Sequence, residues 1–404
     1  MAAIGSAAMR NDRGFNNGTF EGFEEFLSGN HSRFVSVEVL KLDVPMVRPQ
    51  EAAHGTQPIR QSILLRIRDV AGRIGIGECM ALAAPTYTSE WRDGAWAVLN
   101  QWLVPQLLEH QVLPNQNVTG HPMALAAIEM ALADLYTQTH AVSVAKLVGS
   151  STRSIVPRAV VGVGVGQADR AQNERIDDLV DEIALRRDRG YRAVKIKISP
   201  QWSTRPLAAL RSVWPSLDLA VDANGSFSNH AADLLELEEY SLSYIEQPFK
   251  AHQIKLHGLW QTRLETMLAL DESISSPEML QLVIELGIGG LINIKPARLG
   301  GLVPTMDANH LLGEFGVDGF CGGMYELGLG RRLALAVAGL ANLAGRPSDL
   351  SPTEEYLEND IAPQLVLGAD GTVAIPDSIG LSSNLLDDAI INFTIEQAVF
   401  QARS

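Results

Sequence analysis

The chain has 404 residues, which is more than one average domain, and its 20% charged and 46% hydrophobic residues are typical of a globular enzyme. The net charge is −15, from 47 acidic and 32 basic residues without a prominent basic run, so we expect neither a nucleic acid nor an anionic membrane as a partner. The two cysteines, Cys79 and Cys321, are far apart and no stretch of ~18 apolar residues occurs, so neither a disulfide framework nor a membrane span is indicated and a cytoplasmic location is expected.

Residues 1–30 are rich in glycine, asparagine and small residues. They lack the basic start and apolar core of a secretory signal. Two interpretations are open. The segment is a flexible extension, or Phe20, Phe23 and Phe26, spaced by three, form one face of a short helix over 20–27 that docks elsewhere on the protein.

The next part of the chain predicts a domain of mixed α and β structure. Apolar and polar residues alternate over 34–80, as in antiparallel strands, with a turn at Asp69 to Gly72. Helices are expected over 89–108 and 121–140, and in the second an Ala/Leu/Met face lies opposite Glu129 and Asp134.

A first buried strand is expected at 156–164. Gly162, Gly164 and Gly166 there form GxGxG, but a dinucleotide-binding turn needs GxGxxG between a strand and a helix. We therefore expect these small residues to leave room for a substrate.

Five short apolar runs follow, and each ends in charged or polar residues. They read AVKIKI, LAVDAN, SYIEQP, LALDES and LINIKP. From Lys197 to Lys295 the successive steps are 25, 24, 25 and 24 residues, the length of one strand, one helix and two loops. Unbroken apolar strands of this kind indicate a closed parallel barrel, in which all strand C-termini lie on the face that carries the chemistry.

These strand ends bring three carboxylates and several lysines to one place. Oxygen ligands from Asp222, Glu246 and Asp271 suit a hard cation such as Mg2+ and leave positions open for substrate. Burial near a cation lowers the pKa of a lysine, so Lys197 and Lys295 could each act as a base. We therefore expect a proton to be taken from one face of a metal-bound carboxylate and returned to the other.

The strand period of two also orients neighbouring residues. Lys195 shares the face of Lys197, and Asn224 shares that of Asp222, whereas Glu272 points away from Asp271. Later, a seventh strand is expected at 318–323 and an eighth near 348–353. Gly328 and Gly330 precede a helix whose N-terminus could bind an anionic group, or they are plain turn residues.

The motifs KIK, DAN, IEQP, LDES and NIKPARLGG, in this order and spacing, resemble the muconate-lactonizing subgroup of the enolase superfamily. GGMYELGLGR, GTQPIRQSILLRI and GECMALAAPTYTSE are similar to its N-acylamino acid racemase / o-succinylbenzoate synthase branch. The resemblance covers roughly 35–365. It implies an α/β fold, a modified TIM barrel (β/α)7β at 154–355, with an α+β capping domain at 31–153. The segment 356–404 would return to that cap, and 1–30 would be an extension without a counterpart.

The resemblance also implies roles. Lys197 would be one base and Lys195 a supporting charge, with Asn224 and Glu272 supporting the site. Members with a histidine as the second base carry it near 321–323, where this chain has Cys-Gly-Gly, so Lys295 is expected to be the second base. Arg298 would either favour the neutral form of Lys295 or be a surface residue at a helix start.

The implied reaction is removal of the proton α to a carboxylate, through an enediolate, with Mg2+ or, as a substitute, Mn2+. An N-acylamino acid (N-succinylamino acid) racemase is favoured. The alternatives are o-succinylbenzoate synthase, then muconate cycloisomerase or dipeptide epimerase, and, in another class, a metal-dependent binding protein without turnover. Epimerases carry two aspartates on the eighth strand, whereas this chain has Asp349 and then Ser351, which favours an uncharged, acylated nitrogen.

Two cap loops, near 46–56 and 81–88, would close over the barrel mouth. The partner is expected to be a small-molecule carboxylate, and the chain is expected to form a homo-oligomer. The candidate substrate contacts are Met46, Arg48, His54, Tyr87, Gly322, Gly323, Met324 and Asp349.

Overall fold

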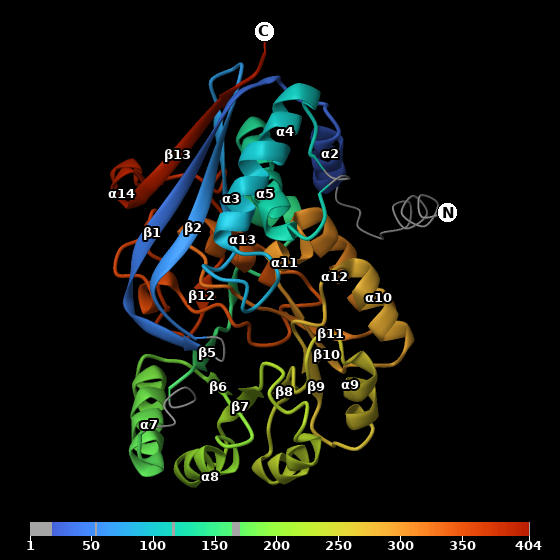
Figure 1. The fold of residues 1–404 in the computed structure, drawn as a ribbon, viewed down its shortest axis with the longest axis vertical. Helices are drawn as coiled ribbons and strands as arrows, with labels where there is room; N and C mark the ends of the chain where they lie inside the picture. Colours follow the sequence, from blue (N-terminus) through green and yellow to red (C-terminus); the bar gives the residue numbers. More distant parts are fainter. Residues whose placement is uncertain (1–17, 53–54, 115–117, 164–169, 404) are drawn as a thin grey trace.

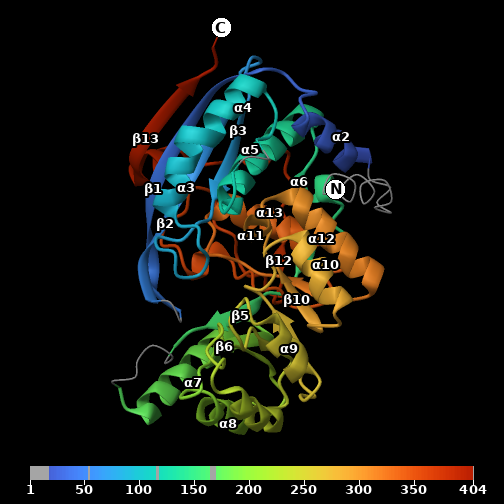
Figure 2. The ribbon, with the colours of Figure 1, turned by 45° about the vertical axis from the view of Figure 1, so that its right-hand side comes forward.

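The structure is a computed structural model that describes the chain except for residues 1–17, 53–54, 115–117, 164–169 and 404. It has a cap on one side and a barrel on the other, which Figures 1 and 2 show from two directions. The cap and the barrel confirm the predicted fold class, a (β/α)7β barrel with an α+β cap. Within the described residues no helix is both long enough and apolar enough to cross a membrane.

The cap is built on a four-stranded antiparallel sheet in the order β13-β1-β2-β3. Its strands are β1 (Phe34–Ala52), β2 (Gly55–Asp69), β3 (Ile74–Cys79) and β13 (Thr394–Gln401). Val37 of β1 lies opposite Ile67 of β2 and Phe400 of β13. The last strand therefore returns to the cap, as expected for this fold.

Three helices pack on one face of the sheet: α3 (Arg92–Val98), α4 (Val104–His110) and α5 (Pro122–His140), which α6 (Val144–Val148) follows. Near the C-terminus, α14 (Asp387–Phe393) lies on the other face, where Asp387 pairs with Arg66 of β2. The helix predicted over 89–108 is divided by a π-helical turn, η1 (Leu99–Leu103), in which Val104 N–H bonds to Leu99 O. Pro105 has no N–H to continue the regular ladder, which accounts for the division.

Helix α5 is buried on every side, so the prediction that Glu129 and Asp134 form a polar face was wrong. It lies directly on β3, where Gly75 and Gly77 leave no room for a Cβ against the backbone of α5. The Asp134 carboxylate accepts N–H groups from Ile76 and from residues 381 and 382. Backbone donors from distant segments thus satisfy a buried carboxylate that the helical pattern placed opposite the apolar face.

Of the two interpretations of the N-terminal segment, the docked helix applies to its described part. Helix α2 (Gly18–Leu27) buries Phe20, Phe23 and Phe26. The rings of Phe23 and Phe26 meet the edge of Tyr136 on α5 at centroid distances of 5.5 and 5.6 Å.

The barrel is a parallel sheet in which β5 to β11 are neighbours in chain order. The strands are β5 (Arg158–Val161), β6 (Ala193–Lys197), β7 (Asp218–Asp222), β8 (Ile245–Glu246), β9 (Leu268–Leu270), β10 (Leu291–Ile294) and β11 (Asp318–Cys321). The connecting helices are α7 (Gln172–Asp188), α8 (Thr204–Val213), the 3-10 helix η2 (Ala231–Tyr240), α9 (Ile254–Gln261), α10 (Pro277–Glu285), α11 (Pro296–Leu299), α12 (Leu302–Phe315) and α13 (Gly328–Ala338).

Residues 348–349 take the place of the eighth strand. Arg158 N–H bonds to Ser348 O at 2.7 Å, and Asp349 N–H bonds to Cys321 O at 2.9 Å. They bridge the two edges of the sheet, β5 and β11, and close the ring. A short antiparallel pair, β4 (Ser154–Ile155) with β12 (Val373–Ala374), and the 3-10 turn η3 (Thr353–Glu355) complete the described elements.

Candidate active site

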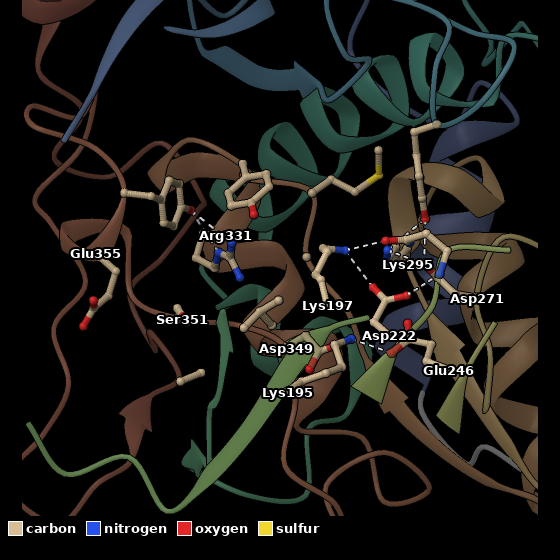
Figure 3. Close-up of a pocket in the computed structure, with 18 of the residues that line it drawn as sticks. Lys195, Lys197, Asp222, Glu246, Asp271, Lys295, Arg331, Asp349, Ser351 and Glu355 are labelled. Atoms are coloured by element: carbon tan, nitrogen blue, oxygen red, sulfur yellow. Dashed lines mark hydrogen bonds and ion pairs between the residues drawn. The ribbon is translucent and has the colours of Figure 1, made fainter. Parts of the chain in front are cut away.

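The strand ends that the sequence singled out surround one cavity of about 130 Å3 between the barrel and the cap. Lys197, Asp222 and Glu246 are direct register neighbours at the ends of β6, β7 and β8. Asp271 and Lys295 come immediately after β9 and β10. Figure 3 shows these side chains pointing into a common space.

On one side of the cavity Lys197 is held by two oxygens. Its Nζ donates to Asp222 Oδ2 at 2.7 Å and to Asn224 Oδ1 at 2.8 Å. Burial has the largest single effect on the pKa of Lys197 and lowers it, but the surrounding acidic groups, Asp222 first among them, together raise the pKa more, so the net pKa is raised. Asn224 in turn donates to Glu272 Oε1 at 2.9 Å, so Glu272 supports the site from behind.

On the other side Lys295 belongs to a tight cluster. Its Nζ donates to Asp271 Oδ2 and to the Tyr87 hydroxyl, both at 2.8 Å. Arg298 is 3% exposed and also donates to Tyr87, at 2.7 Å, and to Asp271. The surface interpretation of Arg298 was therefore wrong. Burial has the largest single effect on the pKa of Lys295 and lowers it, as Arg298 also does, but the surrounding acidic groups, Asp271 first among them, together raise the pKa more, so the net pKa is raised.

Lys195, the other lysine of β6, lies between two carboxylates. Its Nζ donates to Glu246 Oε2 at 2.5 Å and to Asp349. Asn293 donates to the other Glu246 oxygen at 2.8 Å. Burial lowers the pKa of Lys195, and the carboxylates of Asp349 and Glu246 raise it well above its usual value. Lys195 is thus a fixed positive charge.

The carboxylates fit a hard divalent cation in their chemistry. Asp222, Glu246 and Asp271 are at most 4% exposed, come from adjacent strands and line the same cavity. Over the described residues no three acidic, histidine or cysteine side chains already stand in a metal-holding arrangement. Each of the three carboxylates instead contacts a lysine, so a bound cation would compete with ammonium groups for the same oxygens.

Comparison with known proteins fits this arrangement. Residues 35–149 match the mandelate racemase / muconate lactonizing enzyme N-terminal domain, and residues 178–389 match the enolase C-terminal domain-like family. The chain belongs to the enolase superfamily.

Relatives of this superfamily enzyme cover nearly its whole length. An N-succinylamino acid racemase from Amycolatopsis sp. is 36% identical, over 85% of this chain and 93% of the relative. An o-succinylbenzoate synthase from Enterococcus faecalis is 31% identical, over 90% and 99%. The structure of a probable mandelate racemase from Alicyclobacillus acidocaldarius has a TM-score of 0.82 at 31% identity, over 92% and 100%. The chain is therefore an enzyme, an isomerase or a lyase, of a family that generally depends on a divalent metal.

Most candidate residues of this superfamily enzyme line the cavity. Those that do are Tyr87, Lys195, Lys197, Asn224, Asp222, Glu246, Asp271, Lys295, Gly323, Met324 and Asp349. Met46 is buried beside Leu357 and is not among the lining residues. Gly322 lies just behind Lys295, where a Cβ would come within 2.7 Å of its Cε. The side chain of Arg48 and the whole of His54 fall outside the described residues.

The interpretation of Gly328 and Gly330 as an anion site was wrong. Glu78 accepts the N–H groups of Leu327 and Gly330, and Asp360 accepts that of Gly328. The start of α13 is thus bound by carboxylates of the protein itself.

Sequence reasoning missed several lining residues. They are Leu82, Ala159, Val160, Arg186, Tyr325, Arg331, Glu355 and Tyr356. Arg331 stood within the quoted GGMYELGLGR motif, but α13 is buried on all sides, so no polar face marked this arginine. Arg186 comes from α7 and pairs with Glu355, a contact between segments too distant to be recognised in the sequence.

Proposed function

We propose that this enzyme uses Mg2+ to remove the proton α to a carboxylate and that it racemises N-acylamino acids, N-succinylamino acids among them. One observation carries the proposal. Lys197 and Lys295 line the same cavity from β6 and from the end of β10, and the three strands between them supply Asp222, Glu246 and Asp271. Two amines thus flank a row of carboxylates across the barrel mouth (Figure 3).

Asp222, Glu246 and Asp271 would hold the cation. When bound, Mg2+ or Mn2+ would draw electrons from the substrate carboxylate, which acidifies the α-proton. A divalent cation on these oxygens also opposes the effect by which Asp222 and Asp271 raise the pKa of the two lysines.

The lysines would then move the proton. Lys197 Nζ takes it as the α-C–H bond breaks, and Lys295 Nζ returns a proton to the opposite face of the same carbon. For the other enantiomer the two amines exchange roles. Asp222 and Asn224 stabilise the ammonium form of Lys197, and Asp271 and Tyr87 stabilise that of Lys295, so either lysine can hold the proton between the two steps.

The second candidate is o-succinylbenzoate synthase, because relatives with that name match at 31% identity. The same site would remove the α-proton with one lysine while a β-hydroxyl leaves and the other lysine stays cationic. The position of Arg298 against Tyr87 and Asp271 supports the racemase, as does the 36% identity to a named racemase. Ser351 in the lining speaks against a dipeptide epimerase, which carries an aspartate there.

The test is proton exchange in D2O with Mg2+ and both enantiomers of several N-succinyl amino acids. A racemase with two bases incorporates solvent deuterium into both enantiomers. Lys197→Ala should lower racemisation by about 100-fold or more, whereas Lys255→Ala, on the outer helix α9, should not. If neither enantiomer exchanges while a hydroxy-acid substrate is dehydrated, the enzyme is the lyase. A metal-dependent binding protein without turnover would keep its physiological activity when Lys197 is replaced by alanine.

A cytoplasmic location and a homo-oligomeric state complete the proposal. Cell fractionation tests the first, and sedimentation of the purified protein tests the second.

A further inference from the structure

Arg331 lines the cavity and has an unused hydrogen-bond donor. It comes from the first turn of α13, is 3% exposed and lines the same space as the two lysines (Figure 3). Its Nη1 has no hydrogen-bond partner among the described residues. Leaving a buried donor unpaired costs free energy, about 1–3 kcal/mol, and a ligand acceptor would remove that cost.

The other nitrogens of Arg331 are already engaged. Tyr356 Oη lies 3.2 Å from Nε and 3.1 Å from Nη2, and Glu326 Oε2 lies 2.9 Å from Nη2. The Tyr356 hydroxyl itself donates to Glu326 O at 2.5 Å. Tyr356 therefore fixes the guanidinium plane, and Glu326 balances its charge.

This arrangement selects the kind of acceptor. With only one nitrogen open, Arg331 cannot form the two-pronged pair that it usually makes with a carboxylate. The nearby Glu326 also repels a second negative charge. A neutral carbonyl oxygen fits the single open donor better than a carboxylate does.

Two consecutive glycines relate Arg331 to the second lysine. A Cβ on Gly323 would lie 2.7 Å from Arg331 Nη1, and one on Gly322 would lie 2.7 Å from Lys295 Cε. Because neighbouring Cα atoms are about 3.8 Å apart, Lys295 Cε and Arg331 Nη1 are separated by at most about 12 Å.

That span matches an acylated amino acid. The base lies about 3 Å from the α-carbon and the donor about 3 Å from the acyl oxygen. The acyl oxygen is itself about 3 Å from the α-carbon, through bonds of ordinary length. Together with the Cε–Nζ bond, this path reaches about 10 Å, so an acylated amino acid contacts both groups at any separation up to about 10 Å, which is most of the range that the two glycines allow.

We propose that Arg331 Nη1 donates a hydrogen bond to a neutral carbonyl two bonds removed from the carbon that bears the substrate carboxylate. This inference rests on the proposed function and names the substrate class: the acyl C=O is recognised, not the distal carboxylate of a succinyl group, so neutral acyl groups are accepted as well. The ketone of o-succinylbenzoate has the same position relative to its ring carboxylate, so one donor serves both candidate reactions.

The test compares two ligands that differ only at this carbonyl. They are a 2-substituted 4-oxopentanoate and the corresponding pentanoate, measured as competitive ligands of the magnesium-loaded enzyme. The wild-type enzyme should bind the oxo compound roughly 10- to 100-fold more tightly, the effect of a hydrogen bond from a charged donor. In Arg331→Met that ratio should fall to about one.

Control variants separate recognition from structure. Arg331→Met combined with Glu326→Gln avoids an unpaired buried carboxylate and should show the same loss of preference for the carbonyl ligand. If neither of these two variants folds, the same ratio is measured on Arg331→Lys instead. Arg332→Met removes the neighbouring buried arginine, which bonds to Leu381 O and Ser383 O and does not line the cavity, and should keep the wild-type ratio.

The inference is overturned if Arg331→Met weakens both ligands equally or keeps the preference for the carbonyl, or if the wild type has no such preference. Exchange of the α-proton by the wild type is measured in parallel. A wild type that prefers the carbonyl ligand but exchanges no proton of N-acyl amino acids refutes the racemase and leaves the role of Arg331 standing.

Discussion

Replacing Glu129 by glutamine should remove part of the pH dependence of the protein's stability. Glu129 lies on α5 of the cap, is 1% exposed, and its Oε1 accepts the N–H of Val303 at the start of barrel helix α12, at 2.7 Å. Burial raises its pKa from 4.5 to about 8, although the backbone N–H groups of Val303 and Leu302 favour the charged form.

The sign follows from proton binding. Between pH 4.5 and about 8 the folded protein keeps the Glu129 proton, whereas the unfolded chain has released it. The free energy of unfolding therefore falls as the pH rises through this range, by about 1.4 kcal/mol per pH unit from this group. Glutamine has no proton to release but can still accept the hydrogen bond from Val303.

The assay is urea unfolding of the wild type and Glu129→Gln at pH 5.5, 6.5 and 7.5. Relative to the variant, the wild type should lose roughly 3 kcal/mol of stability across these two pH units. Glu109→Gln, on the exposed surface of α4, should change with pH as the wild type does. The reasoning is refuted if wild type and Glu129→Gln change equally with pH, or if the wild type gains stability relative to the variant as the pH rises, because Glu129 would then be ionised in the folded state.

Four further outcomes are expected. Lys197→Ala and Lys295→Ala should each lower racemisation by about 100- to 10,000-fold. Each variant should exchange the α-proton of only one enantiomer, and NMR in D2O should show that the two variants act on opposite enantiomers. Tyr87→Phe removes the hydroxyl that accepts from Lys295, which should lower the pKa of that amine and move the pH profile of kcat to lower pH. Chelation of the metal should abolish proton exchange, and Mg2+ or Mn2+ should restore it; exchange that persists after chelation contradicts a metal-dependent reaction. Phe23→Ala should destabilise the protein by about 3 kcal/mol and expose α2 to proteolysis, whereas equal protease resistance would show that α2 contributes little.

The sequence predicted what regular geometry determines. A spacing of 24 or 25 residues is a whole β/α unit, and a parallel sheet brings all strand ends to one edge, so Lys197, Asp222 and Glu246 were expected together and lie in register. The same spacing, with unbroken apolar runs, predicted the barrel, whereas the return of segment 356–404 to the cap was expected from the resemblance alone.

Contacts that depend on irregular segments were not predictable. Tyr87 reaches Lys295 from a cap loop 208 residues away, and Arg331 lies on a helix without a polar face. Glu129 was placed opposite the apolar face of its helix, and its burial was not predicted because its partner, the N–H of Val303, is a backbone group that leaves no mark in the sequence. The protonation of the lysines could not be predicted either, since it depends on which carboxylate each Nζ contacts.

The pairing of β13 with β1 has a consequence for biosynthesis. β1 is among the first segments to leave the ribosome, yet its neighbour begins only at residue 394, and Lys41 of β1 meets Glu396 of β13 in an ion pair at 2.7 Å. All strands of the barrel are translated before that point. Until the last stretch emerges, one edge of β1 has unpaired backbone groups that can bind another nascent chain. A product that terminates before residue 394 would thus contain every barrel strand and a cap sheet with an exposed, aggregation-prone edge.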